Sequence, residues 1–222
     1  MAIVGSDFHA DMSKVRRFLA YKPEELHIYA GDVVDSWDIP PPNCLACLQA
    51  MHESNAILIY GNHELSYHPD PMARLECSGQ TTFGRIYYHQ YLDDERWLAA
   101  YAVDSYLITH AGYHCNHKIS GKSAEALAKK LNKLFLKRNF KLWQIGYYRG
   151  GMHLNGSIFW YDYLHDKDKL SQRYNQVFGH TQSKVPWEDK QDKYHHVCIN
   201  TDDRSSKLWI FDTTTKEIVE LI

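Results

Sequence analysis

Five short apolar runs, each followed closely by a polar side chain, constrain the fold of this chain more than any other feature. An open sheet collects functional side chains just outside the carboxyl ends of its strands, so residues far apart in sequence can meet at one edge. Carboxylate, amide and imidazole groups together suit transition-metal ions. We therefore expect a metal-dependent enzyme whose candidate ligands are Asp7, His9, Asp32, Asn62, His110 and His180.

The first 65 residues alternate strand-like and helix-like segments. Strands that alternate with helices over such lengths predict right-handed crossovers and a parallel sheet. The expected strands are 2–6, 26–30 and 56–60, and the expected helices run from an N-cap at Ser13 to Tyr21 and over 42–54.

The remaining two thirds of the chain predict a mixed continuation. An amphipathic helix near 122–138 is indicated by Leu127, Leu131, Leu134 and Phe135, which recur with helical spacing. Its lysines are interpreted as a solvated face, with a basic docking surface as the alternative. The aromatic, glycine-rich segment 146–162 is a candidate wall of the substrate site. One or two strands are expected within 97–109, and closing strands of a second, more antiparallel sheet at 195–199, 207–211 and 217–221.

Size and charge narrow the class of protein. A chain of 222 residues is most simply one domain, spanning 1–222, and its net charge of −2 provides no general attraction to long nucleic acid or to anionic membranes. No apolar run is long enough to span a bilayer, and Met1 leads directly into a strand-like segment, so we expect a cytoplasmic protein. The lone CxxC formed by Cys44 and Cys47 is interpreted as two buried residues of a helix rather than a zinc site.

The spacing within the motifs suggests how the ligands act. Residues two apart on an extended segment point the same way, so Asp7 and His9 are expected to hold one ion together. Asp32 follows Gly31 at a strand exit, and its two oxygens make it the best candidate to bridge two ions. The Asn62 amide oxygen would bind the second ion, while His63 would point towards the substrate.

These motifs in this order resemble the calcineurin-like metallophosphoesterase superfamily. The matching segments are Asp7-x-His9, Gly31-Asp32-x-x-Asp35, Gly61-Asn62-His63-Glu64, Thr109-His110-Ala111-Gly112, Gly179-His180-Thr181 and the closing Ile199-Asn200-Thr201-Asp202. Within the superfamily, they are most similar to the branch that holds the Ser/Thr phosphoprotein phosphatases and the diadenosine tetraphosphatases.

The resemblance implies an α/β fold, in which two mixed β-sheets form a sandwich flanked by helices, with a two-metal site at their shared edge. It implies that Asp7, His9 and Asp32 hold one divalent ion, and that Asp32, Asn62, His110 and His180 hold the other. His63 would be the general acid, oriented by Asp35. Two ions lower the pKa of a bridging water and neutralise phosphoryl oxygens. Nitrogen and oxygen ligands without thiolate favour manganese, with iron or zinc as alternatives.

Two positions depart from the family pattern. Gln182 stands where many members have a second histidine, and Ser36-Trp37 replaces the Arg-Gly whose guanidinium clamps the phosphate. Arg149 is a candidate replacement for that clamp, with an ordinary surface arginine as the alternative. Trp37 is a candidate for stacking on a nucleobase, with packing under the following proline-rich loop as the alternative.

Three functions are consistent with these motifs. The first is hydrolysis of phosphomonoesters on a phosphorylated protein or small molecule. The second is hydrolysis of a dinucleoside polyphosphate or a phosphodiester, which Trp37 and the absent Arg-Gly favour. The third is a binding module that keeps the fold without catalysis, which the intact ligand set argues against.

Overall fold

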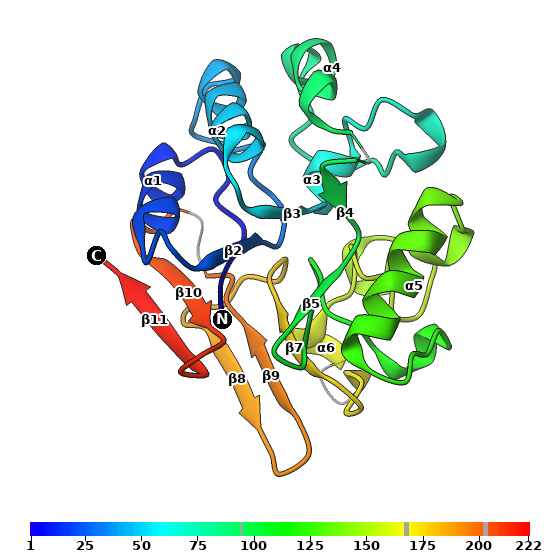
Figure 1. The fold of residues 1–222 in the computed structure, drawn as a ribbon. Coiled ribbons are helices and arrows are strands. Elements are labelled where there is room, and N and C mark those ends of the chain that lie inside the picture. Colours follow the sequence, from blue (N-terminus) through cyan, green and yellow to red (C-terminus); the bar gives the residue numbers. More distant parts are fainter. Residues whose placement is uncertain (94, 167–168, 202–203) are drawn as a thin grey trace.

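Two mixed β-sheets pack face to face, and helices cover their outer faces (Figure 1). The structure is a computed structural model that describes residues 1–93, 95–166, 169–201 and 204–222. Asp202, which belongs to the last motif of the resemblance, lies outside the described residues. The sandwich of two mixed sheets flanked by helices, expected from the sequence, is confirmed.

The first sheet has the strand order β11-β10-β1-β2-β3-β4. The strands β1, β2, β3 and β4 pair in parallel, as expected for the alternating N-terminal segments. The prediction for the two C-terminal strands was wrong, because β10 pairs antiparallel with β1 and carries β11 on its outer edge. The strand bounds are β1 Ala2–Gly5, β2 Leu26–Tyr29, β3 Ile57–Ile59, β4 Trp97–Leu98, β10 Leu208–Asp212 and β11 Glu217–Leu221.

The second sheet has the order β5-β6-β7-β9-β8. Its three inner strands are parallel and its two edge strands are antiparallel. Three short strands occupy residues 97–109, where we expected one or two, because the chain passes from one sheet to the other at Ala99 and Ala100. Both of these amides donate to Oδ1 of Asn132, at 2.9 and 3.0 Å. The bounds are β5 Tyr101–Val103, β6 Tyr106–Ile108, β7 Asn175–Phe178, β8 Trp187–Lys190 and β9 His195–Cys198.

The alternation of side chains along the strands divides the core into layers. In β1, Ala2 and Val4 join a buried cluster that draws members from both sheets, whereas Ile3 packs in the cluster that contains Val15 and Phe18 of α1. Because successive side chains of a strand point to opposite faces, one short strand connects both layers. The result is a rigid support whose strand ends fix the residues that follow them.

The helices are α1 Met12–Ala20, α2 Pro41–Glu53, α3 Asn62–Leu65, α4 Thr82–Tyr87, α5 Ala124–Leu136 and α6 Tyr163–Asp166. Short 3₁₀ turns lie at Pro71–Ala73, His89–Tyr91, Cys115–His117, Phe140–Leu142 and Tyr147–Arg149. The N-cap of α1 is Asp11 rather than the predicted Ser13, because the Asp11 carboxylate accepts hydrogen bonds from the amides of Ser13 and Lys14. Among the described residues, no helix is both long and apolar enough to cross a membrane.

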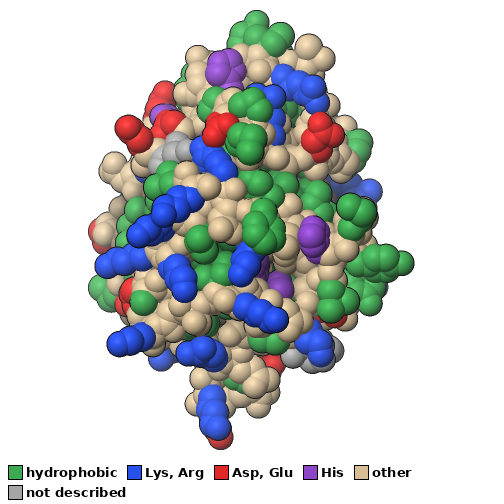
Figure 2. Space-filling model, turned by 90° about the vertical axis from the view of Figure 1, so that its right-hand side faces the viewer, with side chains coloured by type: hydrophobic (Ala, Val, Ile, Leu, Met, Phe, Trp, Pro, Cys, Tyr) green, Lys and Arg blue, Asp and Glu red, His purple; other side chains and the backbone are tan. Residues whose placement is uncertain are grey.

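The two longest helices, α2 and α5, bury the faces that the sequence predicts. Cys44 and Cys47 are buried on α2, and the Cys47 thiol donates to the carbonyl oxygen of Ala10. The amphipathic helix α5 buries Leu127, Leu131 and Phe135. Its lysines lie on the outer face, and Figure 2 shows lysine and arginine side chains gathered on the side of the molecule where α5 lies.

Candidate metal centre

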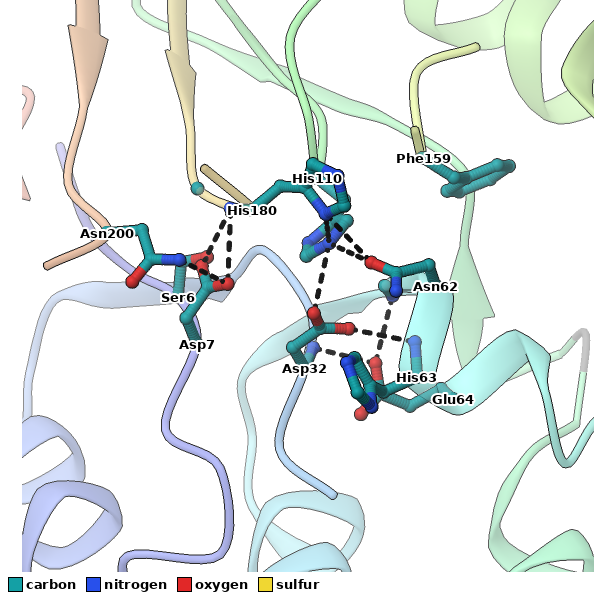
Figure 3. A network of polar contacts seen from close by, with 12 residues as sticks. Ser6, Asp7, Asp32, Asn62, His63, Glu64, His110, Phe159, His180 and Asn200 are labelled. Carbon is teal, nitrogen blue, oxygen red and sulfur yellow. Dashed lines mark hydrogen bonds and ion pairs between the residues drawn. The ribbon is translucent and has the colours of Figure 1, made fainter. Parts of the chain in front are cut away.

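Four polar side chains from different strand ends converge on one point (Figure 3). Oδ1 of Asn62 lies 2.8 Å from Nε2 of His110 and 2.9 Å from Nδ1 of His180, and these two ring nitrogens are 3.1 Å apart. Oδ2 of Asp32 lies 3.2 Å from the same His110 nitrogen. Atoms bound to one ion at about 2.0–2.2 Å are roughly 3 Å from one another. The four donor atoms therefore have the spacing of a metal coordination shell.

The two histidines of this group present lone pairs to the same point. Nδ1 of His110 lies 2.8 Å from the carbonyl oxygen of Ala30, an acceptor, so this nitrogen carries the proton and Nε2 is left as the ligand atom. Burial, and then the positive charge of Arg149, hold the pKa of His180 well below its ordinary value. A metal-binding imidazole must be neutral, a condition that the lowered pKa of His180 favours.

A second group consists of Asp7, His9 and Asp32, whose ligand atoms all lie within 4.8 Å of one another. The Nδ1 atom of His9 is 2.9 Å from the carbonyl oxygen of Asp35, which turns Nε2 towards Asp7, 4.0 Å from its Oδ1. Asp7 accepts hydrogen bonds from the His180 amide and the Asn200 side chain. Burial raises the pKa of Asp7, and the positive charge of His110 offsets only part of this rise. A divalent cation here would supply further positive charge.

Asp32 belongs to both groups. Its Oδ1 accepts a hydrogen bond from the His63 amide, while Oδ2 faces His110. Burial opposes its charge, but the surrounding imidazoles, His110 foremost, hold the pKa of this carboxyl well below its ordinary value. Asp32 in turn raises the pKa of His110 to about 9 in spite of burial. A bound cation would replace that proton, since metals compete with protons for the same lone pairs.

The backbone at the site is unusually strained. Asp7, His9, Asp32, Asp35 and His180 all have positive φ, between 43° and 67°. The prediction that Asp7 and His9 lie on an extended segment was therefore wrong, since β1 ends at Gly5 and the two side chains converge through a left-handed turn. Such conformations cost about 1–3 kcal/mol each and persist only where the surrounding structure enforces them.

Glu64 enforces part of this conformation, a role that the sequence reasoning missed. Its buried carboxylate accepts hydrogen bonds from the amides of Asp32, Val33, Val34 and Gly61, at 2.7 to 3.2 Å. It therefore fixes the turn that carries Asp32. The available signal was a glutamate three residues after the N-cap Gly61, a position from which its side chain reaches back to the N-cap amide.

Two glycines allow the carboxylates to approach the backbone. A side chain at Gly61 would overlap with the carboxylate of Asp32, and one at Gly179 would overlap with that of Asp7. The glycines before Asn62 and His180 in their motifs therefore make room for ligands that come from other strands.

His63 lies beside the two groups and faces the pocket. Its Nδ1 is 2.9 Å from Oδ2 of Asp35, and the hydroxyl of Tyr67 donates to the other oxygen of that carboxylate at 2.7 Å. Burial lowers the pKa of His63, but the charge of Asp32 and the contact with Asp35 outweigh this and raise it well above its ordinary value. The pair can therefore hold a proton on the imidazole next to the candidate ligands.

The ligand groups open into a pocket of about 430 Å³. The 146–162 segment contributes Arg149, Trp160 and Asp162 to its wall. Arg149 lies with Nε 3.0 Å from Asp162 and donates through Nη2 to the Thr181 hydroxyl at 2.6 Å. Trp37 also lines the pocket and is 79% exposed, so the interpretation that it packs under the proline-rich loop is wrong.

Comparisons with known proteins identify a family and similar folds. A family model described as calcineurin-like phosphoesterase matches residues 3–208. Among solved structures, the chain is similar to a cold-active protein-tyrosine phosphatase of a psychrophilic Shewanella species, at 12% identity over 100% of this chain and 80% of that one, with a TM-score of 0.60. It is also similar to a putative diadenosine tetraphosphatase, at 14% identity over 99% and 91% of the two chains (TM-score 0.56). A third similar structure is a metallophosphoesterase from Sphaerobacter thermophilus, at 12% identity over 99% and 86% (TM-score 0.53). No curated protein matches the chain. At these identities the likeness shows the fold.

Proposed function

The chain belongs to the calcineurin-like phosphoesterase family, and from this premise we propose that it is a dinuclear metal-dependent hydrolase of phosphomonoesters. The observation that carries the proposal is that Asp32 is shared by two adjacent groups of ligand atoms. One group then holds the first ion through Asp7, His9 and Asp32. The other holds the second through Asp32, Asn62, His110 and His180.

Two bound divalent cations, manganese in this proposal, supply Lewis-acid activation of water and neutralise phosphoryl charge. The protein provides the fixed oxygen and nitrogen donors, and thiolate is absent from both groups. Iron and zinc remain alternatives, because imidazole suits all three metals.

His63 acts as the general acid in this proposal. Its Nδ1–H donates a hydrogen bond to the Asp35 carboxylate, so Nε2 is the ring nitrogen that donates to the leaving oxygen. An alkoxide leaves poorly without a proton, and a positioned donor contributes about 10²- to 10⁴-fold. Tyr67 holds the other oxygen of Asp35, which keeps the pair aligned.

Arg149 takes the place of the absent Arg-Gly clamp in this proposal. Asp162 and Thr181 hold its guanidinium at the pocket wall. A guanidinium so fixed can donate to phosphoryl oxygens with little loss of side-chain entropy. The substrate is then a phosphorylated protein or small molecule whose phosphate reaches the ligand groups at the base of the pocket.

Hydrolysis of a dinucleoside polyphosphate or a phosphodiester is the second candidate function. The exposed indole of Trp37 on the pocket rim favours it, because a nucleobase could stack there. A non-catalytic binding module is disfavoured by the complete ligand set.

A comparison of three substrates tests the proposal. Manganese-loaded protein is expected to hydrolyse p-nitrophenyl phosphate faster than bis-p-nitrophenyl phosphate and faster than a dinucleoside polyphosphate. The reverse order would transfer the proposal to the second function. Absence of hydrolysis of all three by protein shown to contain metal would refute the enzyme.

A further inference from the structure

A third group of metal-binding side chains lies next to the two groups described above. The ligand atoms of Asp35, His63 and Cys77 all lie within 4.8 Å of one another. We propose that these three residues form a separate site for a thiophilic cation, Zn²⁺, and that zinc bound there inhibits the enzyme by occupying His63. The binding stands on geometry alone, whereas the inhibition rests on the proposed function.

The three ligands come from three different segments. Asp35 follows β2 in the loop after Asp32, His63 is on α3, and Cys77 is on the connection between Pro71–Ala73 and α4. Asp35 is buried and anchored by Tyr67, so its remaining oxygen, Oδ2, faces His63 at 2.9 Å. A half-buried thiol completes the group. The site is therefore not a lone cysteine but a convergence of carboxylate, imidazole and thiol.

The segment that carries Cys77 covers the Asp35–His63 pair. A Cβ added to Gly79 would lie 3.7 Å from Cβ of Asp35 and 3.9 Å from Cε1 of His63, which shows how closely this turn passes over both side chains. Ser78 and Gly79 also line the pocket. Asp35 and His63 line it as well, so a cation that enters the pocket reaches two of the three ligands directly.

The chemistry of the three ligands selects zinc over manganese. Zinc is bound by thiolate, imidazole and carboxylate at about 2.0–2.3 Å, often with three protein ligands and one open position. Soft thiolate ligands favour zinc, whereas manganese prefers oxygen donors. Ligand atoms already within 4.8 Å of one another reach that geometry through small side-chain rotations. The thiol and, where it is charged, the imidazole each release a proton when the ion binds.

The expected consequence is inhibition that depends on Cys77. Zinc in this site would bind Nδ1 of His63, the ring nitrogen that faces Asp35, so the ring could no longer form the doubly protonated imidazolium that donates from Nε2 to the leaving oxygen. Among the described residues, the other four cysteines belong to no such group of ligands. Cys115, which is exposed, therefore provides a matched control for any effect of removing a thiol.

Cobalt spectroscopy tests the site without reference to activity. Coordination by thiolate gives Co²⁺ a sulfur-to-metal charge-transfer band in the near ultraviolet, whereas nitrogen and oxygen ligands do not. Titration with Co²⁺ is expected to produce this band in the unmodified protein and in Cys115→Ser, and no band in Cys77→Ser or Cys77→Ala. A protein that binds cobalt without the band would overturn the proposal, as would a band that survives both Cys77 substitutions.

Zinc inhibition of the manganese-loaded protein tests the second part of the proposal, that zinc bound at this site inhibits hydrolysis. Each variant is compared with its own rate before zinc is added. The zinc concentration for half-inhibition is expected to rise at least about 10-fold in Cys77→Ser and to be unchanged in Cys115→Ser, as for loss of one metal-holding contact. Equal sensitivity of all three proteins would overturn the inhibition. Because the cobalt band needs no turnover, a band without any hydrolysis would refute the proposed function and leave the zinc site standing.

Discussion

The base of the pocket and its rim hold their side chains in different ways. At the base, Asp7, Asp32, Asn62, His110 and His180 are all buried, and each contacts at least one other member or a fixed backbone group. At the rim, Trp37 and Leu164 are 79% and 48% exposed. The base is therefore organised before a substrate arrives, whereas the rim is free to adapt.

The difference in backbone conformation leads to the same conclusion. Asp7, Asp32 and His180 at the base have left-handed φ values, while Arg149 and Trp37 do not. Strain of this kind is retained where the surrounding hydrogen bonds enforce it, as Glu64 does for the turn of Asp32. We infer that substitutions at the base affect metal content and chemistry, and that substitutions at the rim affect the choice of substrate.

The largest expected effect is that of Asp32→Asn. Asparagine can still accept the hydrogen bond from the His63 amide, but it has one oxygen and no charge with which to bridge two cations. We expect both ions to be lost together, with a fall in activity of more than about 10³-fold, beyond the 10–100-fold typical of residues that only orient ligands. Metal analysis and kcat/KM measure this, with the exposed Asp192→Asn as the control. Retention of both ions would mean that the base is not organised around Asp32.

His63→Ala separates chemistry from metal binding within the buried region. The expected result is an unchanged metal content and a kcat lowered by about 10²- to 10⁴-fold, with the largest loss for substrates that have poor leaving groups. His89→Ala, an exposed histidine outside the pocket, is the control. If His63→Ala lost as much metal as Asp32→Asn, His63 could no longer be distinguished, as the general acid, from the metal ligands.

The ends of the strands explain why the positions of the base could be predicted from sequence. Asp32, His110 and His180 follow closely on β2, β6 and β7, and the paired strands fix where the next residue goes. The apolar runs that mark these strands are visible in the sequence, so the expected convergence needed only the rule that ligands gather at their carboxyl ends. The same reasoning anticipated the parallel pairing of β1, β2 and β3.

Features that depend on long-range pairing could not be predicted in this way. The role of Glu64 rests on amides some 30 residues earlier in the chain, at Asp32 and Val33. The strand β10 resembles an ordinary closing strand, and nothing local indicates that its partner is β1. The exposure of Trp37 likewise depends on how the proline-rich loop leaves the surface, which its composition does not determine.

Arg149 lies on the boundary between the base of the pocket and its rim. Its replacement by alanine is expected to have a smaller effect than Asp32→Asn or His63→Ala. Its guanidinium is held by Asp162 and Thr181, so it is more ordered than the rest of the rim. Hydrogen bonds to a charged group contribute about 1.5–3 kcal/mol, which corresponds to a fall in kcat/KM of roughly 10- to 150-fold without loss of metal. Arg149→Lys should recover little of the lost kcat/KM. A single ammonium group cannot contact Asp162 and Thr181 and also donate a hydrogen bond to the phosphate. Arg173→Ala, an exposed arginine elsewhere, is the control, and an equal effect of both alanine variants would exclude a phosphate clamp at Arg149.

Trp37→Ala is expected to have the smallest effect on general phosphatase activity and the sharpest dependence on substrate. Because its indole is exposed on the rim, its removal should leave hydrolysis of p-nitrophenyl phosphate within about twofold of the original rate, as for other surface substitutions. For a dinucleoside polyphosphate, loss of a stacked base would weaken kcat/KM by roughly 5- to 150-fold, since such stacking contributes about 1–3 kcal/mol. Phe140→Ala removes an aromatic side chain of similar exposure that lies outside the pocket, and should affect neither substrate. Only a contact with the nucleobase can distinguish the dinucleoside polyphosphate from p-nitrophenyl phosphate. Equal losses for both substrates in Trp37→Ala would therefore show that the rim supports the bottom of the pocket rather than selecting the substrate.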